Sequence, residues 1–433
     1  MPWERGGRDG EFFCNMPIET FTLSNGLRIA CESMPSARSV AVGVYIGTGS
    51  RDERSSERGV SHFIEHILFK GTLRRDALDI VREIEGRGGY INAETDKEHT
   101  AFYVRMLPED LSVALDVLSD MLLSPRLDPQ DIEREKHVVL EELRELMDYP
   151  EEYVYDLFAQ TLWSRHPLAH PVIGTAPTIL ALNSSHLRGV MDERYTAPNT
   201  VVSAAGQVDA GQLVPLVERF FAKMPATQPR TQWRPARACA RQRLVRRRTQ
   251  QVHFCMGTAG YSLYDERKYT LAVLDTLLGG NMSSRLFQEV REKRGLVYQI
   301  STSAMAYREG GYFAIHANCS PDHYGQVMEV IHEQLRAVCE GGLTEEEVQR
   351  AKHQLRGSLL MSTESVNGRM SANARSLLFQ GRVITVDEII EKIEAVDAQK
   401  VVAVARELFG NGKMALAAIG SLPQGGVQQD DSD

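Results

Sequence analysis

An aperiodic stretch rich in proline and arginine near the middle of the chain most constrains its fold. Residues 221–243, FAKMPATQPRTQWRPARACARQR, show neither helical nor strand periodicity. A similar order of strand-like and helix-like segments recurs on both sides, and 433 residues exceed one ordinary hydrophobic core. We therefore expect two homologous lobes. The predicted boundaries are 17–225 for the first lobe, 226–243 for the linker, 244–425 for the second lobe and 426–433 for a polar, disordered tail.

The hydrophobic patterns within each half mix strands with helices. Alternation in SVAVGVYIGTG (39–49), after an Asn-Gly turn at Asn25, predicts strands. Helical periodicity then covers 59–70, 108–123 and 129–147. This order indicates the α+β class, in which each lobe is a mixed or antiparallel sheet covered by helices.

The composition excludes several classes of protein. A net charge of −9 argues against a nucleic-acid binder, which needs a basic surface. No window approaches the length of apolar sequence that spans a bilayer, so we expect no membrane span. The six cysteines form no CxxC pair, and the first residues lack the apolar core of a signal peptide. A cytoplasmic location with reduced thiols is therefore expected.

The segment GVSHFIEHILFKGT carries the first group of candidate catalytic residues. On a helix, His62 and His66 lie one turn apart on the face opposite the apolar residues, with Glu65 beside them. Two imidazoles at this spacing reach a single tetrahedral Zn²⁺, and a neighbouring carboxylate can lie over its open position. The order HxxEH reverses the HExxH motif of many zinc peptidases. The alternative is an ordinary solvated helix face.

A second predicted helix, DIEREKHVVLEELRELMDYP, offers a third ligand. Glu135 and Glu142 are seven residues apart and fall at the edge of its apolar stripe. A carboxylate turned toward a core needs a cation or hydrogen bonds. A zinc site with two histidines and one glutamate is one such partner. The alternative is pairing with arginines such as Arg82 or Arg105.

Four separated motifs resemble those of one peptidase family. They are HFIEHILFKGT, GGYINAETDKEHTAFYV, VVLEELRE and LGGNMSSRLFQEVREKRGLVY. The chain resembles the pitrilysin or insulinase (M16, inverzincin) family over roughly residues 17–420, and specifically its short branch, similar to mitochondrial processing peptidase β-subunits and their bacterial homologues. The resemblance implies a processing-peptidase-like metallohydrolase fold in a bacterial zinc endopeptidase that cleaves peptides or extended N-terminal segments.

The resemblance also implies roles for the residues of the two helices. Zinc, one ion per chain, would be bound by His62, His66 and a glutamate 76 residues after the second histidine, which is Glu142 because 142 − 66 = 76. Glu135 would support the site by accepting the free N–H of a ligand imidazole. Glu65 would be the general base that takes a proton from zinc-bound water.

Further residues are implied outside the metal site. In the family an arginine and a tyrosine seven positions apart contact the substrate and stabilise the oxyanion, and Arg291 and Tyr298 match that spacing. Asn92 and Ala93 resemble the edge strand on which a peptide substrate is paired backbone to backbone. On sequence alone, an arginine and a tyrosine around Gly295 are commonplace, and the strand could be an ordinary charged edge.

Two other functions compete with an active endopeptidase. The first is a noncatalytic scaffold or core subunit of a larger complex, similar to relatives that have lost ligands or the glutamate base; this chain retains His62, Glu65, His66 and Glu142. The second is a subunit that needs a partner, because the short branch works as two facing chains. We expect a homodimer or a heterodimer with a related subunit.

Overall fold

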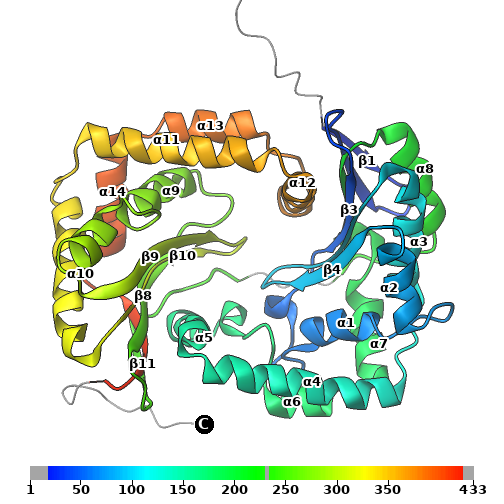
Figure 1. The fold of residues 1–433 in the computed structure, drawn as a ribbon, viewed down its shortest axis with the longest axis horizontal. Coiled ribbons are helices and arrows are strands. Elements are labelled where there is room, and N and C mark those ends of the chain that lie inside the picture. The colour runs from blue at the N-terminus through cyan, green and yellow to red at the C-terminus, as the bar shows by residue number, and fades with distance from the viewer. Residues whose placement is uncertain (1–17, 230–233, 423–433) are drawn as a thin grey trace, which may run out of the picture.

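The computed structural model describes residues 18–229 and 234–422 and contains two sheets flanked by helices (Figure 1). The predicted α+β class with two lobes is confirmed. The predicted tail 426–433 lies outside the described residues. Each sheet is mixed, with one parallel strand pair among antiparallel ones.

The first sheet has six strands in the order β1-β2-β6-β3-β5-β4. Every residue of the central strands β3 and β6 is buried, as their apolar sequences VAVGVYI and TVVSAAG require. The strand β4 lies at one edge and alternates exposed and half-buried residues. The strands are β1 (Glu19–Thr22), β2 (Arg28–Ser33), β3 (Val40–Ile46), β4 (Tyr90–Thr95), β5 (Thr100–Met106) and β6 (Thr200–Gly206).

The second sheet has five strands in the order β7-β11-β8-β10-β9, which leaves β9 at an edge. Its first strand begins at Gln242, two residues inside the predicted linker 226–243. The strands are β7 (Gln242–Arg246), β8 (Val252–Gly260), β9 (Val297–Ala306), β10 (Gly311–Cys319) and β11 (Ala415–Gly420).

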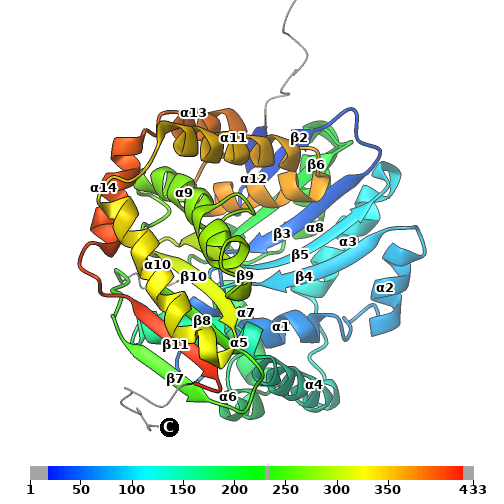
Figure 2. The same ribbon diagram turned by 60° about the vertical axis from the view of Figure 1, so that its left-hand side comes forward.

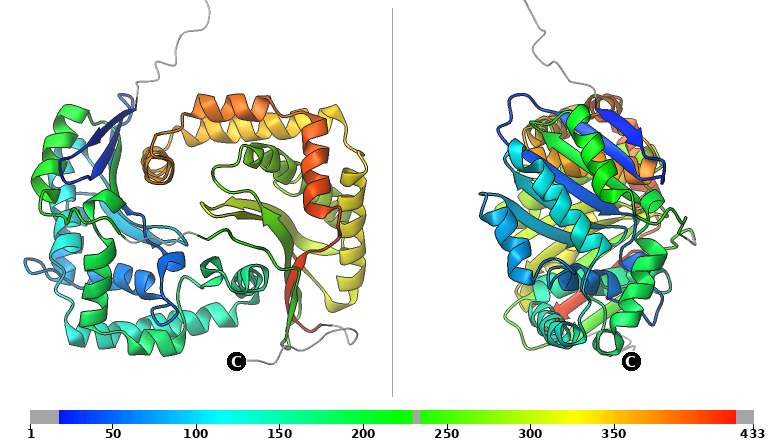
Figure 3. Two further views of the ribbon diagram at one scale, coloured as in Figure 1. Left: turned by 180° about the vertical axis from the view of Figure 1, so that it is seen from behind. Right: turned by 90° about the vertical axis from the view of Figure 1, so that its right-hand side faces the viewer.

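Helices cover the outer side of each sheet, as Figure 1 and the rear view in Figure 3 show. The first half contributes α1 (Val60–Leu68), α2 (Ala77–Glu85), α3 (Leu111–Leu123), α4 (Pro129–Asp148), α5 (Pro150–Trp163), α6 (Ala176–Ala181), α7 (Ser184–Arg194) and α8 (Ala210–Phe221). The second half contributes α9 (Arg267–Leu278), a π-helical turn (Phe287–Glu292), α10 (Tyr324–Cys339), α11 (Glu345–Ser362), α12 (Val366–Gln380), α13 (Val386–Glu394) and α14 (Ala398–Phe409).

The two halves exchange one helix each across the space between the sheets. The helix α5 packs Leu157 and Phe158 against β8 and β11 of the second sheet. The helix α12 packs on β3 and β6 of the first sheet, as Figure 2 shows. A Cβ at Gly43 of β3 would lie 2.9 Å from Sδ of Met370, so glycine permits this close approach. By packing, α12 therefore belongs with the first sheet, although it lies inside the predicted range 244–425.

Buried ion pairs fix the hairpin between β9 and β10 to the first lobe. Arg308 donates to Glu98 at 3.0 Å, and Arg51 donates to Glu309 at 2.8 Å. All four side chains are largely buried, and Arg51 also pairs with Asp52 at 3.1 Å, so these charges are compensated away from water. The hairpin end of the second sheet is thereby held beside β4 and β5.

The predicted absence of a membrane span agrees with the helices of the described ranges. None of these helices is both long enough and apolar enough to cross a bilayer. The five cysteines in these ranges are not disulfide-bonded.

Candidate metal centre

The helix α1, which carries HxxEH, has a tightly held start. Gly59 caps it with a φ of 87°, and a Cβ there would lie 2.5 Å from the carbonyl oxygen of Ile173. The carboxylate of Glu53 accepts hydrogen bonds from the backbone N–H groups of Gly59 at 2.7 Å and Ser61 at 2.8 Å. These bonds satisfy donors that the first helical turn leaves free. These contacts therefore fix the orientation of α1 independently of its histidines.

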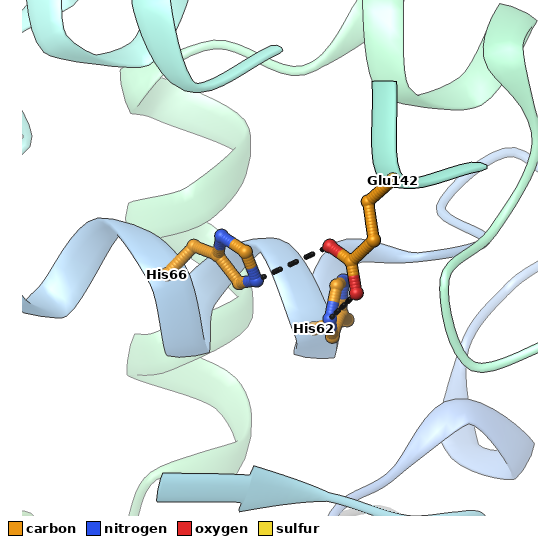
Figure 4. Close-up of side chains that lie close together, drawn as sticks. All are labelled: His62, His66 and Glu142. Carbon is orange, nitrogen blue, oxygen red and sulfur yellow. Dashed lines mark ion pairs between the residues drawn. The ribbon is translucent and has the colours of Figure 1, made fainter. Parts of the chain in front are cut away.

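The apolar face of α1 is buried in the core of the first lobe, so the histidines face α4. Among the residues that the structure describes, only His62, His66 and Glu142 place three potential ligand atoms within 4.8 Å of one another. Nε2 of His62 lies 3.6 Å from Oε1 of Glu142, and Nε2 of His66 lies 3.6 Å from its Oε2 (Figure 4). Atoms bound tetrahedrally to Zn²⁺ at about 2.1 Å lie roughly 3.4 Å apart. The donor set and its spacing therefore fit a zinc ion.

Burial keeps the imidazole of one candidate ligand neutral. Burial, helped by the nearby His66, lowers the pKa of His62 to about 4, so His62 offers a lone pair at neutral pH. Nδ1 of His62 is buried and has no hydrogen-bond partner in the described part of the chain.

Glu135 lies seven residues before Glu142 on α4 and contacts the imidazole of His66. Its Oε1 lies 2.9 Å from Nδ1 of His66, and its Oε2 lies 2.7 Å from Nζ of Lys70. Burial acts to raise the pKa of Glu135, but the hydrogen bonds from His66 and Lys70 outweigh it and the pKa is lowered. Its partners are thus a histidine and a lysine, not the arginines considered from the sequence.

Glu65 lines a cavity of about 640 Å³ together with His62 and Glu142, two of the three candidate ligands. Burial raises its pKa, and the neighbouring Glu142 and Glu94 add to this effect. One oxygen of Glu65 accepts a hydrogen bond from Oγ1 of Thr95 at 2.5 Å. The cavity wall is strongly acidic. Its carboxylates are Glu65, Glu94, Glu142, Glu145, Glu151, Glu152 and Asp156.

The strand β4, which bears Asn92 and Ala93, is a free edge next to this cavity. The N–H of Ala93 donates to Oδ1 of Asn92 at 2.9 Å instead of to β5. Nδ2 of Asn92 in turn donates to the hydroxyl of Tyr90 at 2.8 Å. In an antiparallel ladder the backbone groups of successive residues point alternately toward the paired strand and away from it. Those of Ile91, Ala93 and Thr95 point away from β5, toward the free edge.

The structure does not bring Arg291 and Tyr298 to Glu65 of the same chain. The guanidinium of Arg291 lies over the rings of Phe287 at 4.7 Å and Tyr298 at 5.3 Å, in the second lobe. Tyr298 is 73% exposed and is the second residue of β9, whereas Arg308, beyond the other end of that strand, contacts the first lobe. Ten residues of extended strand separate these two residues by roughly 30 Å.

Sequence analysis missed Thr95 and Lys70. Both had a signal: Thr95 is two residues after Ala93 and therefore on the same face of a strand, and Lys70 is four residues after His66 on the same helical face. Neither residue type is distinctive enough to be selected without the tertiary contacts.

Comparisons with known proteins identify the family to which the chain belongs. Residues 28–176 match the family model described as insulinase (peptidase family M16), and residues 181–355 match the peptidase M16 inactive domain. An uncharacterized zinc protease of Streptomyces coelicolor is 40% identical over 94% of this chain and 90% of its own length. The chain is a member of the M16 peptidase family. The family resemblance inferred from the four motifs is thus confirmed.

Other M16 relatives cover nearly the whole chain. An uncharacterized zinc protease of Bacillus subtilis is 38% identical over 90% of this chain and 96% of its own length. The M16 inactive domain of Pseudomonas fluorescens has a TM-score of 0.89 at 18% identity and covers 96% of this chain and 100% of its own. A Helicobacter pylori protease has a TM-score of 0.87 at 21% identity, covering 93% and 99%. The two solved structures show a shared fold, and the named relatives support a peptidase-type function.

Proposed function

We propose that this M16 member is a zinc-dependent endopeptidase with one zinc per chain. The observation that carries the proposal is the convergence of His62, His66 and Glu142 at tetrahedral spacing, with the carboxylate of Glu65 in the adjoining cavity. Glu135 would hold His66 so that its Nε2 faces the metal position.

The chain's own residues would divide the chemistry. When bound, zinc would acidify a water molecule and polarise the scissile carbonyl. Glu65 would accept the proton of the attacking water and pass it to the leaving amine, the role of a general base and then a general acid. Its pKa is raised above the ordinary value by burial and by the nearby carboxylates, which makes it a stronger base than a free glutamate.

The substrate would bind as an added strand on β4. The outward backbone groups of Ala93 are available once the side chain of Asn92 releases its N–H. The small side chain of Ala93 leaves room for the peptide to approach.

The acidic cavity supports a preference for basic peptides. Seven carboxylates line it, and no lysine or arginine of the described ranges is part of its wall. An arginine or lysine side chain near the cleaved bond would meet compensating charge there, whereas an acidic side chain would be repelled. We therefore propose substrates with basic residues close to the cleavage site.

A dimer would complete the site. Arg291 and Tyr298 lie far from Glu65 of their own chain, so if they act on the substrate they must come from a second chain. A homodimer with two facing chains would supply each cavity with the partner's pair. A bacterial cytoplasmic location goes with this proposal, since the related zinc proteases are bacterial and the described cysteines are unpaired.

The proposal is tested by assaying the purified chain, with its zinc content measured, on a quenched fluorescent peptide library. Cleavage that requires zinc and disappears in a zinc-loaded Glu65→Gln variant is the expected result. Bound zinc without activity in the native chain would point to a missing related subunit. No zinc at all would favour the noncatalytic scaffold.

A further inference from the structure

The catalytic carboxylate is held by a residue that no motif singled out. Oγ1 of Thr95 donates to Oε2 of Glu65 at 2.5 Å. Within the described ranges this is the one side-chain hydrogen bond that Glu65 makes. The opposite oxygen, Oε1, is left to accept a proton from a water in the cavity.

The contact restrains a half-buried side chain in an acidic surrounding. Glu65 lines the cavity together with two further carboxylates, Glu142 and Glu94, and Thr95 lines the same cavity. A hydroxyl that donates to Oε2 restricts rotation of the carboxylate, so Oε1 keeps one direction.

Thr95 is at the same time the last residue of the free edge strand. The N–H of Asp96 donates to the carbonyl of His99 at 2.8 Å, which closes the hairpin. The pair Thr95–Thr100 just before that turn is therefore the kind whose backbone groups point outward. Thr95 thus directs its backbone groups to the edge proposed for the substrate. Its hydroxyl is directed to Glu65, the proposed base.

We propose that Thr95 is a positioning residue that orients Glu65 through its hydroxyl and ties the orientation of the base to the edge strand β4. This inference rests on the proposed function. A general base contributes about 10²–10⁴-fold to a rate, and a base free to rotate loses part of that factor. We expect loss of the hydroxyl to lower kcat about tenfold to a hundredfold, with KM nearly unchanged.

The test compares three variants of the full-length chain. Thr95→Val removes the hydroxyl at constant shape, Thr95→Ser keeps the hydroxyl, and Thr100→Val is the matched control. Oγ1 of Thr100 donates to the carbonyl of Thr48 at 2.9 Å, so this control loses a hydroxyl of the same hairpin that is not bonded to Glu65. The measurements are kcat, KM and zinc content, together with crystal structures of the zinc-loaded native chain and Thr95→Val.

The expected pattern is specific to positioning. In Thr95→Val we expect a lower kcat at unchanged zinc content, and a Glu65 carboxylate that has left its native orientation. Thr95→Ser recovers most of the rate, and Thr100→Val keeps the native kcat. A rise in KM alone would assign Thr95 to substrate binding, and loss of zinc would assign it to the metal site. Equal losses in Thr95→Val and Thr95→Ser would show that the methyl group matters. Each of these three results overturns the proposal.

Failure of this inference is distinguishable from failure of the proposed function. If the native chain is zinc-loaded and active but Thr95→Val matches it in kcat, only the positioning role is wrong. If the native chain binds no zinc and cleaves nothing, the endopeptidase itself is wrong. In that case an unmoved Glu65 carboxylate in the Thr95→Val structure would independently overturn the role of the hydroxyl.

Discussion

Nδ1 of His66 lies 2.9 Å from Oε1 of Glu135, while Oε2 of that carboxylate lies 2.7 Å from Nζ of Lys70. The buried glutamate thereby turns Nε2 of His66 toward Glu142, where a metal would be bound. It also links α1 to α4, the two helices that supply the proposed ligands.

Removing this carboxylate should weaken zinc binding. In Glu135→Leu the imidazole of His66 loses its acceptor, so we expect the zinc dissociation constant to rise about 10- to 100-fold. Competition with a chromogenic chelator measures it. Glu133→Leu, on an exposed face of α4, is the control and should bind zinc as the native chain does. Native affinity in Glu135→Leu would show that the hydrogen bond to His66 has no role in metal binding.

Glu65→Gln should separate metal binding from turnover. The amide keeps the shape of the side chain but cannot accept the proton of water, so we expect kcat to fall at least about 10²-fold. Zinc content should stay at one per chain, as elemental analysis can check. Retained activity in a zinc-loaded variant would exclude Glu65 as the general base.

Neutralising the cavity wall should change substrate preference. In the double variant Glu151→Gln and Glu152→Gln we expect KM for an arginine-containing peptide to rise about tenfold, as the loss of two nearby opposite charges implies. The KM for a neutral peptide should stay the same, and added salt should reduce the difference. The double variant Glu345→Gln and Glu346→Gln, an exposed change of equal charge on α11, is the control. An equal rise in KM for both peptides would contradict the electrostatic preference.

Two inactive variants should complement each other if the site is shared between chains. Mixed dimers of Glu65→Gln and Tyr298→Phe contain one site with both native residues, so a refolded equimolar mixture should regain about a quarter of native activity per chain. Each variant alone should stay inactive or nearly so. Size-exclusion chromatography with light scattering checks that dimers form. No recovery in a mixture of proven dimers would rule out an active site shared in this way.

Asp275 should make stability depend on pH. Burial raises its pKa to about 6, against hydrogen bonds from Thr302 and the backbone of Ala304, and its Oδ1 has no partner in the described part of the chain. Between pH 4 and 6 the folded chain holds a proton that the unfolded chain releases, so the free energy of unfolding falls as pH rises. The contribution is roughly 3 kcal/mol. Asp275→Asn should remove it. Urea unfolding at pH 4 and pH 7.5 should therefore show a smaller change in the variant, and equal changes would contradict the prediction.

The sequence by itself determined the features that depend on the spacing of residues along the chain. His62 and His66 lie one helical turn apart whatever surrounds them, and the periodicity of α4 brings Glu135 and Glu142 to one face. The two lobes and the α+β class likewise follow from periodicity and length. These features depend on residues close in the chain, where backbone geometry leaves few alternatives.

Only the tertiary structure decided how these elements meet. The exchange of α5 and α12 between the sheets and the hydrogen bond from Thr95 to Glu65 join segments that are distant in sequence. Such contacts depend on how whole apolar faces pack, and many registers are compatible with the same hydrophobic pattern. A threonine hydroxyl in particular has no recognisable pattern until the carboxylate that it contacts is placed beside it.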